Sequence, residues 1–199
     1  CGNTGHHEIA VMISQRDILK DGVIGTTMNA RDATSTPALG LLAPVDSAIP
    51  PEANRLYPGG IRFLGASLGL AKMTPQGYDQ VLDRIAPLAK VLAQEGATAI
   101  TLMGTSLSFY NGSAFNRELT QRITAASGCP AVTMSTAVTE GLRSVGGKRL
   151  AVATAYNEEV NCRLQAFLDE EGFEVLVIRG LGVERVEDIH RVTQDGLFK

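Results

Sequence analysis

Residues 97–110 read ATAITLMGTSLSFY, so that an apolar run passes directly into glycine, threonine and serine. A short apolar run bounded by turn residues is typical of a buried strand. We therefore predict a strand at 97–103 that enters a turn at Gly104, Thr105 and Ser106. Similar apolar runs predict further strands at residues 38–43, 61–66, 131–134, 149–153 and 173–178.

Helical patterns separate these strands. Residues 74–95 carry apolar side chains at helical spacing, with Thr74 as the N-cap, Pro75 at the first helical position and Gly96 after the last turn. Strands that alternate with helices predict an α/β fold with a parallel sheet, in which ligands bind beyond the carboxyl ends of the strands. Further helices are expected at residues 50–57, 115–126, 136–145, 157–171 and 186–192. Gly128 is expected to end the second of these and Asn157 to cap the fourth.

The composition limits the classes of partner. The chain has 199 residues and a formal net charge of -3, so it lacks the basic surface that binds nucleic acid or an anionic membrane. No apolar run approaches the roughly 20 residues of a membrane helix. The three cysteines, Cys1, Cys129 and Cys162, show no repeating spacing, which argues against a disulfide framework and favours a reducing cytoplasm.

Residues 1–37 do not follow the α/β pattern. We interpret them as a poorly ordered N-terminal extension, in which Met28 is a plausible start and the residues before it are either upstream translation or a genuine extension. Adjacent His6 and His7 do not face one point, so no metal site is predicted there.

Two motifs at predicted strand ends have the chemistry to bind an anion. Gly104 lets a ligand approach the backbone, and the hydroxyls of Thr105 and Ser106 lie beside their own N–H groups, which together can form an anion nest. Tyr156 follows the strand at 149–153, where a phenol can donate a hydrogen bond to an oxyanion. The structural alternatives, an ordinary Ser/Thr turn and a half-buried tyrosine, stay open on the local pattern.

Other residues have a simpler interpretation. The hydroxyls at 133–136 are explained by helix capping, with Ser135 or Thr136 as the N-cap. Tyr78 either lies near a cavity at these strand ends or packs against its own helix. An apolar pocket or plain core explains Leu70, Met73, Met103 and Leu107.

Taken in order, several strings resemble the arylmalonate decarboxylases of the Asp/Glu racemase superfamily, over about residues 39–192. They are RLYP at 55–58, LGL at 68–70, TP at 74–75 with GYD at 77–79, MGTSLSFY at 103–110, TMSTAV at 133–138 and ATAY at 153–156. The resemblance implies two Rossmann-like lobes with parallel sheets, related by a pseudo-twofold, with the active site between them. The first lobe would span 38–135, and the second, incomplete lobe 136–199.

The resemblance also implies cofactor-free decarboxylation of aryl- or alkenyl-malonates to chiral acids through an enediolate. Thr105, Ser106 and Tyr156 would be the catalytic donors of a dioxyanion hole. We expect a cytoplasmic monomer whose partner is a small malonate-type dicarboxylate. Family analogy places the substrate-binding positions at Gly104, Pro44, Leu70, Met73, Tyr78, Met103, Leu107, Val186 and Ile189.

The chain departs from the family at the proton donor, a cysteine at a strand end of the second lobe. Cys1, Cys129 and Cys162 do not align with it, so we expect this donor beyond residue 199, and the chain is then a fragment or is catalytically impaired. A racemase or isomerase of the superfamily needs a cysteine where Gly104 stands.

Two alternatives from other classes were weighed. A non-catalytic anion-binding domain would keep the nest without an acid. A dinucleotide-binding domain would need Gly-x-Gly-x-x-Gly after the first strand, and residues 43–48 read APVDSA instead.

Overall fold

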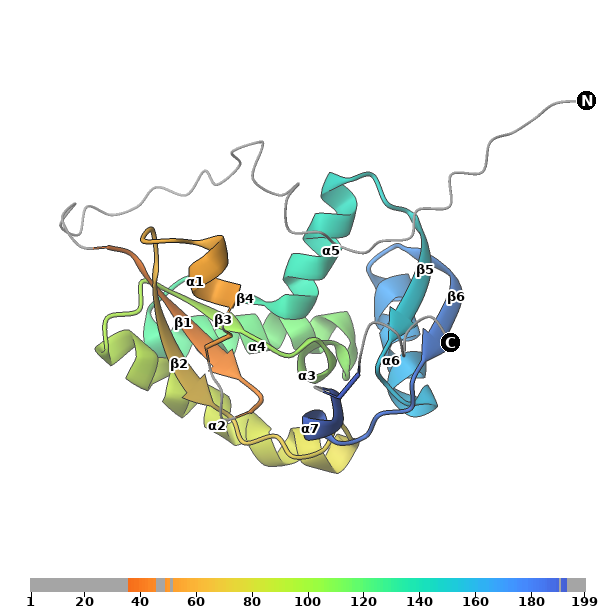
Figure 1. Cartoon of the computed structure of the whole chain (residues 1–199), viewed down its shortest axis with the longest axis horizontal. Helices are drawn as coiled ribbons and strands as arrows, with labels where there is room; N and C mark the ends of the chain where they lie inside the picture. Colours follow the sequence, from red (N-terminus) through yellow and green to blue (C-terminus); the bar gives the residue numbers. More distant parts are fainter. Residues whose placement is uncertain (1–35, 46–48, 51, 190, 193–199) are drawn as a thin grey trace, which may run out of the picture.

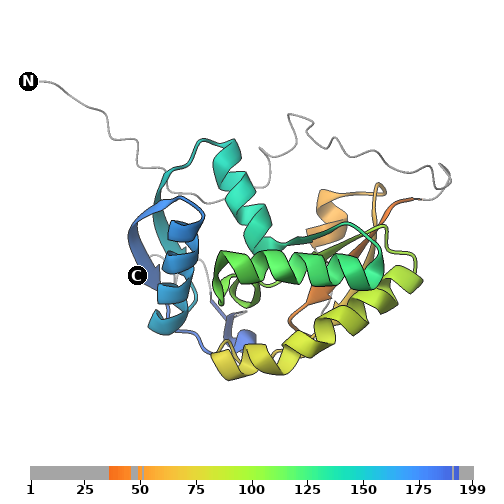
Figure 2. The ribbon, with the colours of Figure 1, turned by 180° about the vertical axis from the view of Figure 1, so that it is seen from behind.

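The structure is a computed structural model, and it describes residues 36–45, 49–50, 52–189 and 191–192. Its first sheet has the strand order β2-β1-β3-β4, and all three pairings are parallel. The strands are β1 (Ala38–Ala43), β2 (Arg62–Ser67), β3 (Ala99–Leu102) and β4 (Ala131–Thr133). A short helix α1 (Glu52–Leu56) joins β1 to β2. The long helices α2 (Pro75–Gln94) and α4 (Gly112–Ser127) lie side by side on one face of this sheet (Figure 2).

A second, two-stranded parallel sheet lies at the other end of the molecule (Figure 1). It consists of β5 (Arg149–Thr154) and β6 (Glu174–Gly180), joined by α6 (Glu158–Glu170). Helix α5 (Met134–Ser144) leads from the first sheet to the second, and α3 (Thr105–Phe109) follows β3. The predicted α/β class with parallel sheets is confirmed. The pseudo-twofold and the boundary at 135/136 stay predictions.

The sequence signals for the helix ends act as expected at three places. Thr74 caps α2 by accepting a hydrogen bond from the Gly77 N–H at 3.3 Å. Asn157 caps α6 in the same way, with its side-chain oxygen 3.0 Å from the Val160 nitrogen. Gly128 ends α4 with φ 70°, a left-handed conformation that glycine adopts without a steric penalty.

The structure corrects two local predictions. Thr133, and not Ser135 or Thr136, is the N-cap of α5: its hydroxyl accepts from the Thr136 N–H at 3.1 Å, because the helix begins two residues earlier than the pattern suggested. In place of the predicted turn after Gly104, the chain forms the first turn of the short helix α3, which is closed by hydrogen bonds within the helix.

The last described segment returns to the first sheet. After β6 the chain runs back, and the Met73 N–H donates to the Glu184 carbonyl at 2.9 Å. Val186 opens α7 (Val186–Ile189), and its N–H donates to the Ala71 carbonyl at 3.4 Å. This helix is shorter than the predicted 186–192. The segment around Val186 is therefore held against residues 71–73 of the first region.

Of the proposed extension at residues 1–37, residues 1–35, which include both of its histidines, lie outside the described residues. None of the helices in the described part of the chain has the length and apolar character that crossing a bilayer requires.

Candidate active site

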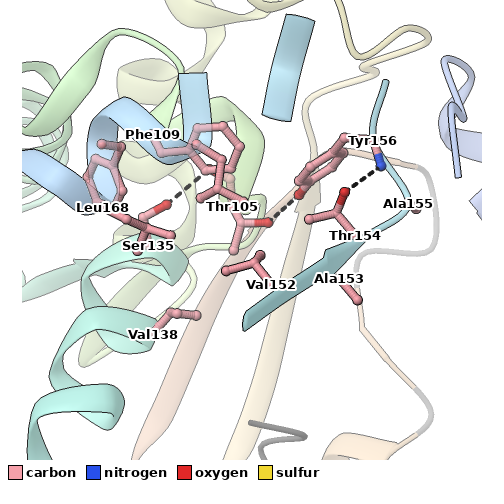
Figure 3. A pocket seen from close by; sticks show the side chains of 12 residues that line it. Thr105, Phe109, Ser135, Val138, Val152, Ala153, Thr154, Ala155, Tyr156 and Leu168 are labelled. Carbon is pink, nitrogen blue, oxygen red and sulfur yellow. Dashed lines mark hydrogen bonds between the residues drawn. The ribbon is translucent and has the colours of Figure 1, made fainter. Parts of the chain in front are cut away.

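The core of the candidate site is a hydroxyl pair formed by Thr105 and Tyr156. Their side-chain oxygens are 2.6 Å apart, and Figure 3 shows the two groups pointing toward one another. Thr105 opens α3 at the carboxyl end of β3, and Tyr156 follows β5 in the second sheet. Residues 51 positions apart in the chain thus meet where strands of two different sheets end.

Local hydrogen bonds position Tyr156. Its N–H donates to the Thr154 hydroxyl at 3.1 Å, and that hydroxyl donates to the Asn161 side-chain oxygen at 2.7 Å. The Phe109 ring packs edge-on against the Tyr156 ring, with 5.8 Å between centroids. The Tyr156 phenol is therefore positioned by a hydrogen bond of its own backbone and by the packing of its ring against Phe109 of α3.

A cavity of about 320 Å³ lies beside the pair (Figure 3). Its walls are mostly apolar, with hydroxyls from α3, α5, β5 and the turn after β5. Thr105 and Tyr156 line it, but the predicted donor Ser106 does not. The full lining is Thr105, Phe109, Ser135, Val138, Val152, Ala153, Thr154, Ala155, Tyr156, Leu164, Phe167 and Leu168.

Ser106 is buried and lies near a different phenol, that of Tyr78. Tyr78 is only 2% exposed, and its hydroxyl has no hydrogen-bond partner of good geometry among the described residues. Burial raises the pKa of the Tyr78 phenol well above its usual value, and the Ser106 side chain acts against this rise. Its ring lies 4.8 Å from that of Tyr110, centroid to centroid. Tyr78 thus presents an unsatisfied polar group next to the second predicted donor.

Four predicted substrate-binding residues lie close together around the start of α3. The Leu70 N–H donates to the Pro44 carbonyl at 2.6 Å. A Cβ atom at Gly104 would lie 3.6 Å from the Leu107 Cβ and 4.0 Å from the Pro44 side chain. Gly104 has φ 153° and ψ 91°, a conformation that residues with a side chain rarely adopt. Contacts at 3.6 Å and 4.0 Å are ordinary van der Waals contacts, so glycine is required here for the backbone conformation and not for space.

The other predicted pocket residues are distributed more widely. Met73 and Val186 are buried and are brought near each other by the returning segment. Met103 is partly exposed just after β3. The side chain of Ile189 lies outside the described residues. None of the nine predicted substrate-binding residues lines the cavity beside Thr105 and Tyr156.

A pair of buried serines lies behind Thr105 and was not predicted from the sequence. The hydroxyls of Ser108 and Ser135 are 2.6 Å apart, and each also lies 3.0 Å from the Thr105 carbonyl. Ser108 stands three residues after Thr105, a spacing that places both on one face of a helix. Ser135 belongs to the hydroxyl run at residues 133–136, which helix capping was expected to explain. The sequence therefore holds no separate signal for a second role of Ser135.

The two described cysteines lie away from the donor pair. Cys129 precedes β4 at the amino end of the sheet, where its thiol donates to the Ala97 carbonyl at 3.2 Å. Cys162 is exposed on α6. Within the described residues, no group of three or more His, Cys, Asp or Glu side chains is placed to hold a metal ion.

Comparison with known proteins places this site in a family of carbon–carbon lyases. The sequence profile of arylmalonate decarboxylase matches residues 39–199, and the chain belongs to that family. The curated arylmalonate decarboxylase of Bordetella bronchiseptica is 46% identical over 159 residues, which cover 79% of this chain. The chain spans 66% of the length of that relative.

Solved structures agree with this placement. A ligand-bound double mutant of arylmalonate decarboxylase superposes with a TM-score of 0.78 at 45% identity, over 81% of this chain and 69% of its own. A maleate cis-trans isomerase from Nocardia farcinica, bound to Tris, reaches a TM-score of 0.74 at 19% identity, over 80% and 69% of the two chains. The isomerase shares the fold.

Proposed function

We propose that the chain provides the donor site of a decarboxylase that acts on aryl- or alkenyl-malonates without a cofactor. The observation that carries this proposal is the Thr105–Tyr156 pair, in which two hydroxyls from two sheets meet at an apolar cavity. Family membership supports it, because the relatives that match are decarboxylases of arylmalonates. The proposed activity is that of the whole protein, and the chain spans 66% of the length of its curated relative.

The donors would bind one of the two substrate carboxylates. In the free protein one of the Thr105 and Tyr156 hydroxyls donates to the other. A carboxylate placed between them would accept from both, and Ser106 would contribute from the next position of α3. Loss of CO2 leaves an electron pair that spreads into this carboxylate as an enediolate. Each donor aimed at that charge contributes about 3 kcal/mol, if it acts like an oxyanion-hole donor.

The other carboxylate would lie among apolar side chains, for which we propose Leu70, Met73 and Leu107, with Met103, Pro44 and Val186 nearby. A carboxylate loses hydration there, whereas the departing CO2 is neutral and needs none. Leu70, Met73 and Leu107 are buried in the free protein, so substrate entry requires them to move apart. The delocalised enediolate is its own electron sink, which is why the proposed reaction uses no cofactor.

Protonation of the carbanion completes the reaction, and a positioned acid typically accelerates such a step by ~10²–10⁴. We propose that neither Cys129 nor Cys162 supplies this proton. The first lies at the wrong end of the sheet, with its thiol bonded to a carbonyl, and the second is exposed on the outside of α6. This placement favours a second candidate function for the chain taken alone: binding of malonates without turnover.

The decisive experiment measures phenylmalonate binding by calorimetry and CO2 release on the same purified protein. We expect binding that Tyr156→Phe and Thr105→Val each weaken by at least about tenfold, since each removes a donor to a charged group. Tyr57→Phe, which changes an exposed tyrosine, is the matched control. Binding without CO2 release would favour the second candidate. Unchanged affinity in both donor variants would contradict the proposed site.

Two further expectations accompany this function. We propose that the protein is monomeric and cytoplasmic. Sedimentation at micromolar concentration tests the first, and fractionation of the producing cells tests the second.

A further inference from the structure

We propose that Ser135 is a positioning residue for the Thr105–Tyr156 pair and that it acts through the Thr105 carbonyl. The proposal rests on the proposed function, because it assigns the pair a ligand. The Ser135 hydroxyl forms no hydrogen bond with the Thr105 hydroxyl or the Tyr156 hydroxyl. It instead holds the backbone from which the Thr105 hydroxyl extends.

Ser135 connects α5 to the first turn of α3. It is 2% exposed, and its hydroxyl lies 3.0 Å from the Thr105 carbonyl and 2.6 Å from the hydroxyl of Ser108. Ser108 is fully buried and lies within 3.1 Å of the Gly104 carbonyl as well. Each serine has one proton to donate. Whichever serine donates to the other, the second donates to a carbonyl of this turn.

Helix capping does not account for Ser135. The N-cap of α5 is Thr133, and the side chains of Thr133, Asn116 and Thr136 form their own hydrogen-bonded group at 2.6 to 3.0 Å. Ser135 points away from that group and into the turn that carries the donor. The capping network therefore stays complete when the Ser135 hydroxyl is removed.

The turn at Thr105 needs an external support. Helix α3 has five residues, and its N-cap, Gly104, makes no side-chain hydrogen bond. Glycine at that position also leaves the preceding backbone free to rotate. The hydroxyls of Ser135 and Ser108 fix the plane of the Thr105 carbonyl, and that plane determines where the Thr105 hydroxyl meets Tyr156 from the second sheet.

The test compares Ser135→Ala with Ser113→Ala. Ser113 is a matched control, because it is also buried and its hydroxyl has no hydrogen-bond partner among the described residues. The first readout needs no ligand: the NMR signal of the phenolic carbon of Tyr156, in protein labelled at tyrosine and assigned by its loss in Tyr156→Phe. The second readout is the affinity for phenylmalonate in wild type, in both serine variants and in the double variant Ser135→Ala/Tyr156→Phe.

We expect Ser135→Ala to shift the Tyr156 signal and to weaken phenylmalonate binding about three- to tenfold, the effect of one lost hydrogen bond. In the Tyr156→Phe background the loss should shrink to less than twofold, because the group being positioned is gone. Ser113→Ala should change neither readout. A purely structural role would instead lower stability equally in both backgrounds and leave the two affinity losses additive.

The proposal is overturned if Ser135→Ala leaves the Tyr156 signal and the affinity at their wild-type values. If Ser135→Ala does not fold, Ser135→Gly, which also removes the hydroxyl, replaces it, and an unshifted Tyr156 signal in that variant is equally decisive. If phenylmalonate does not bind the wild type, the proposed function fails, but the Tyr156 signal still decides whether Ser135 positions the pair.

Discussion

The two sheets of the molecule differ in how completely their strands are covered. In the first sheet, β1 pairs with β2 on one side and β3 on the other, and Leu42 in its middle is 0% exposed. In the second, β6 pairs with β5, and its Leu176 is 46% exposed, although both strands are apolar runs in the sequence. An apolar run therefore predicts a strand, while its burial depends on how many layers pack around it.

The thinner region is held to the denser one by contacts of α6. The Glu170 carboxylate accepts from the Ser113 N–H at the start of α4, at 2.7 Å. The Tyr110 hydroxyl donates to Glu159 at 3.0 Å, and Phe109 packs on Phe167 with 6.1 Å between ring centroids. The candidate site lies at this seam, with Thr105 on the dense side and Tyr156 on the thin side. The Thr105–Tyr156 distance therefore depends on how the two regions pack against each other, as well as on the fold of each sheet.

The largest expected effect comes from truncating one strand leucine in each of the two sheets, a buried one in the first and an exposed one in the second. Leu42→Ala should lower the free energy of unfolding by about 3 kcal/mol, because it leaves a cavity in a fully buried layer. Leu176→Ala should change it by less than about 0.5 kcal/mol, because that side chain is nearly half exposed. Urea denaturation of both variants measures the contrast. Equal losses would show that the second sheet is as well covered as the first.

The next effect concerns the tie between the regions. Glu170→Ala should destabilise the protein by about 1 kcal/mol, since it removes a charged acceptor from the N-terminus of α4. Asp169→Ala, on the neighbouring exposed residue, is the control. Hydrogen exchange should show faster opening of α6 and β6 than of β1 in the Glu170 variant. Uniformly faster exchange would mean that the regions open together.

A smaller effect depends on pH. Burial alone would raise the pKa of Glu171, but the hydrogen-bonded Arg143 guanidinium and the nearby Ser113 side chain lower it below its ordinary value. The ionised carboxylate therefore stabilises the fold above the unfolded-state pKa, and this contribution is lost as the pH falls through the folded-state pKa. Glu171→Gln should cost roughly 1 kcal/mol at pH 7 and progressively less as the pH falls toward the folded-state pKa, in a series of urea titrations.

Glu140→Gln serves as the control for that series, because Glu140 contacts the same Arg143 from an exposed position. Its cost at pH 7 should be within about 0.5 kcal/mol of zero. A Glu171 effect that persists unchanged at acidic pH would rule out the charge as its source.

The smallest effect, of opposite sign, concerns Tyr78. Replacing a buried hydroxyl that lacks a good partner is neutral or stabilising, so Tyr78→Phe should gain about 0.5 kcal/mol at pH 7. Because the pKa of this phenol is raised, its neutral form stabilises the fold below the ordinary tyrosine pKa, and that contribution is lost as the pH rises toward the folded-state value. The advantage of the variant should therefore grow above about pH 10.

The affinity of Tyr78→Phe for phenylmalonate gives the prediction its second arm. A gain in stability with a loss of affinity would mark the phenol as a ligand-binding group at the seam. A loss of stability at pH 7 would show instead that the hydroxyl is well bonded in the protein.

Local signals in the sequence predicted most elements of the fold. Thr74, Asn157 and Gly128 act at the helix ends where they were expected, because capping depends on a few neighbouring backbone groups. The cap of α5 was predicted wrongly. Four residues at 133–136 include three hydroxyls, all of them chemically able to cap, and only the pairing of β4 with β3 shows where the strand stops.

The candidate site was predictable in part. Thr105 and Tyr156 were recognised from their places after predicted strands and from the family resemblance, although the two strands belong to different sheets. Ser106 was predicted to share their cavity, but α3 turns it toward Tyr78, because successive residues of a helix point about 100° apart. Ser108 and Ser135 were missed, because nothing in the local sequence distinguishes a serine that supports a neighbouring turn from one that caps a helix.

By itself, the sequence determined the alternation of strands and helices, the parallel α/β class and the residue types able to bind an anion, because these follow from periodicity, capping and side-chain chemistry. Tertiary structure alone decided that Tyr156 of one sheet lies 2.6 Å from Thr105 of the other, and that Ser135 holds the carbonyl behind it. Such contacts join residues 30 to 51 positions apart, and only the packing of whole elements determines which of them meet.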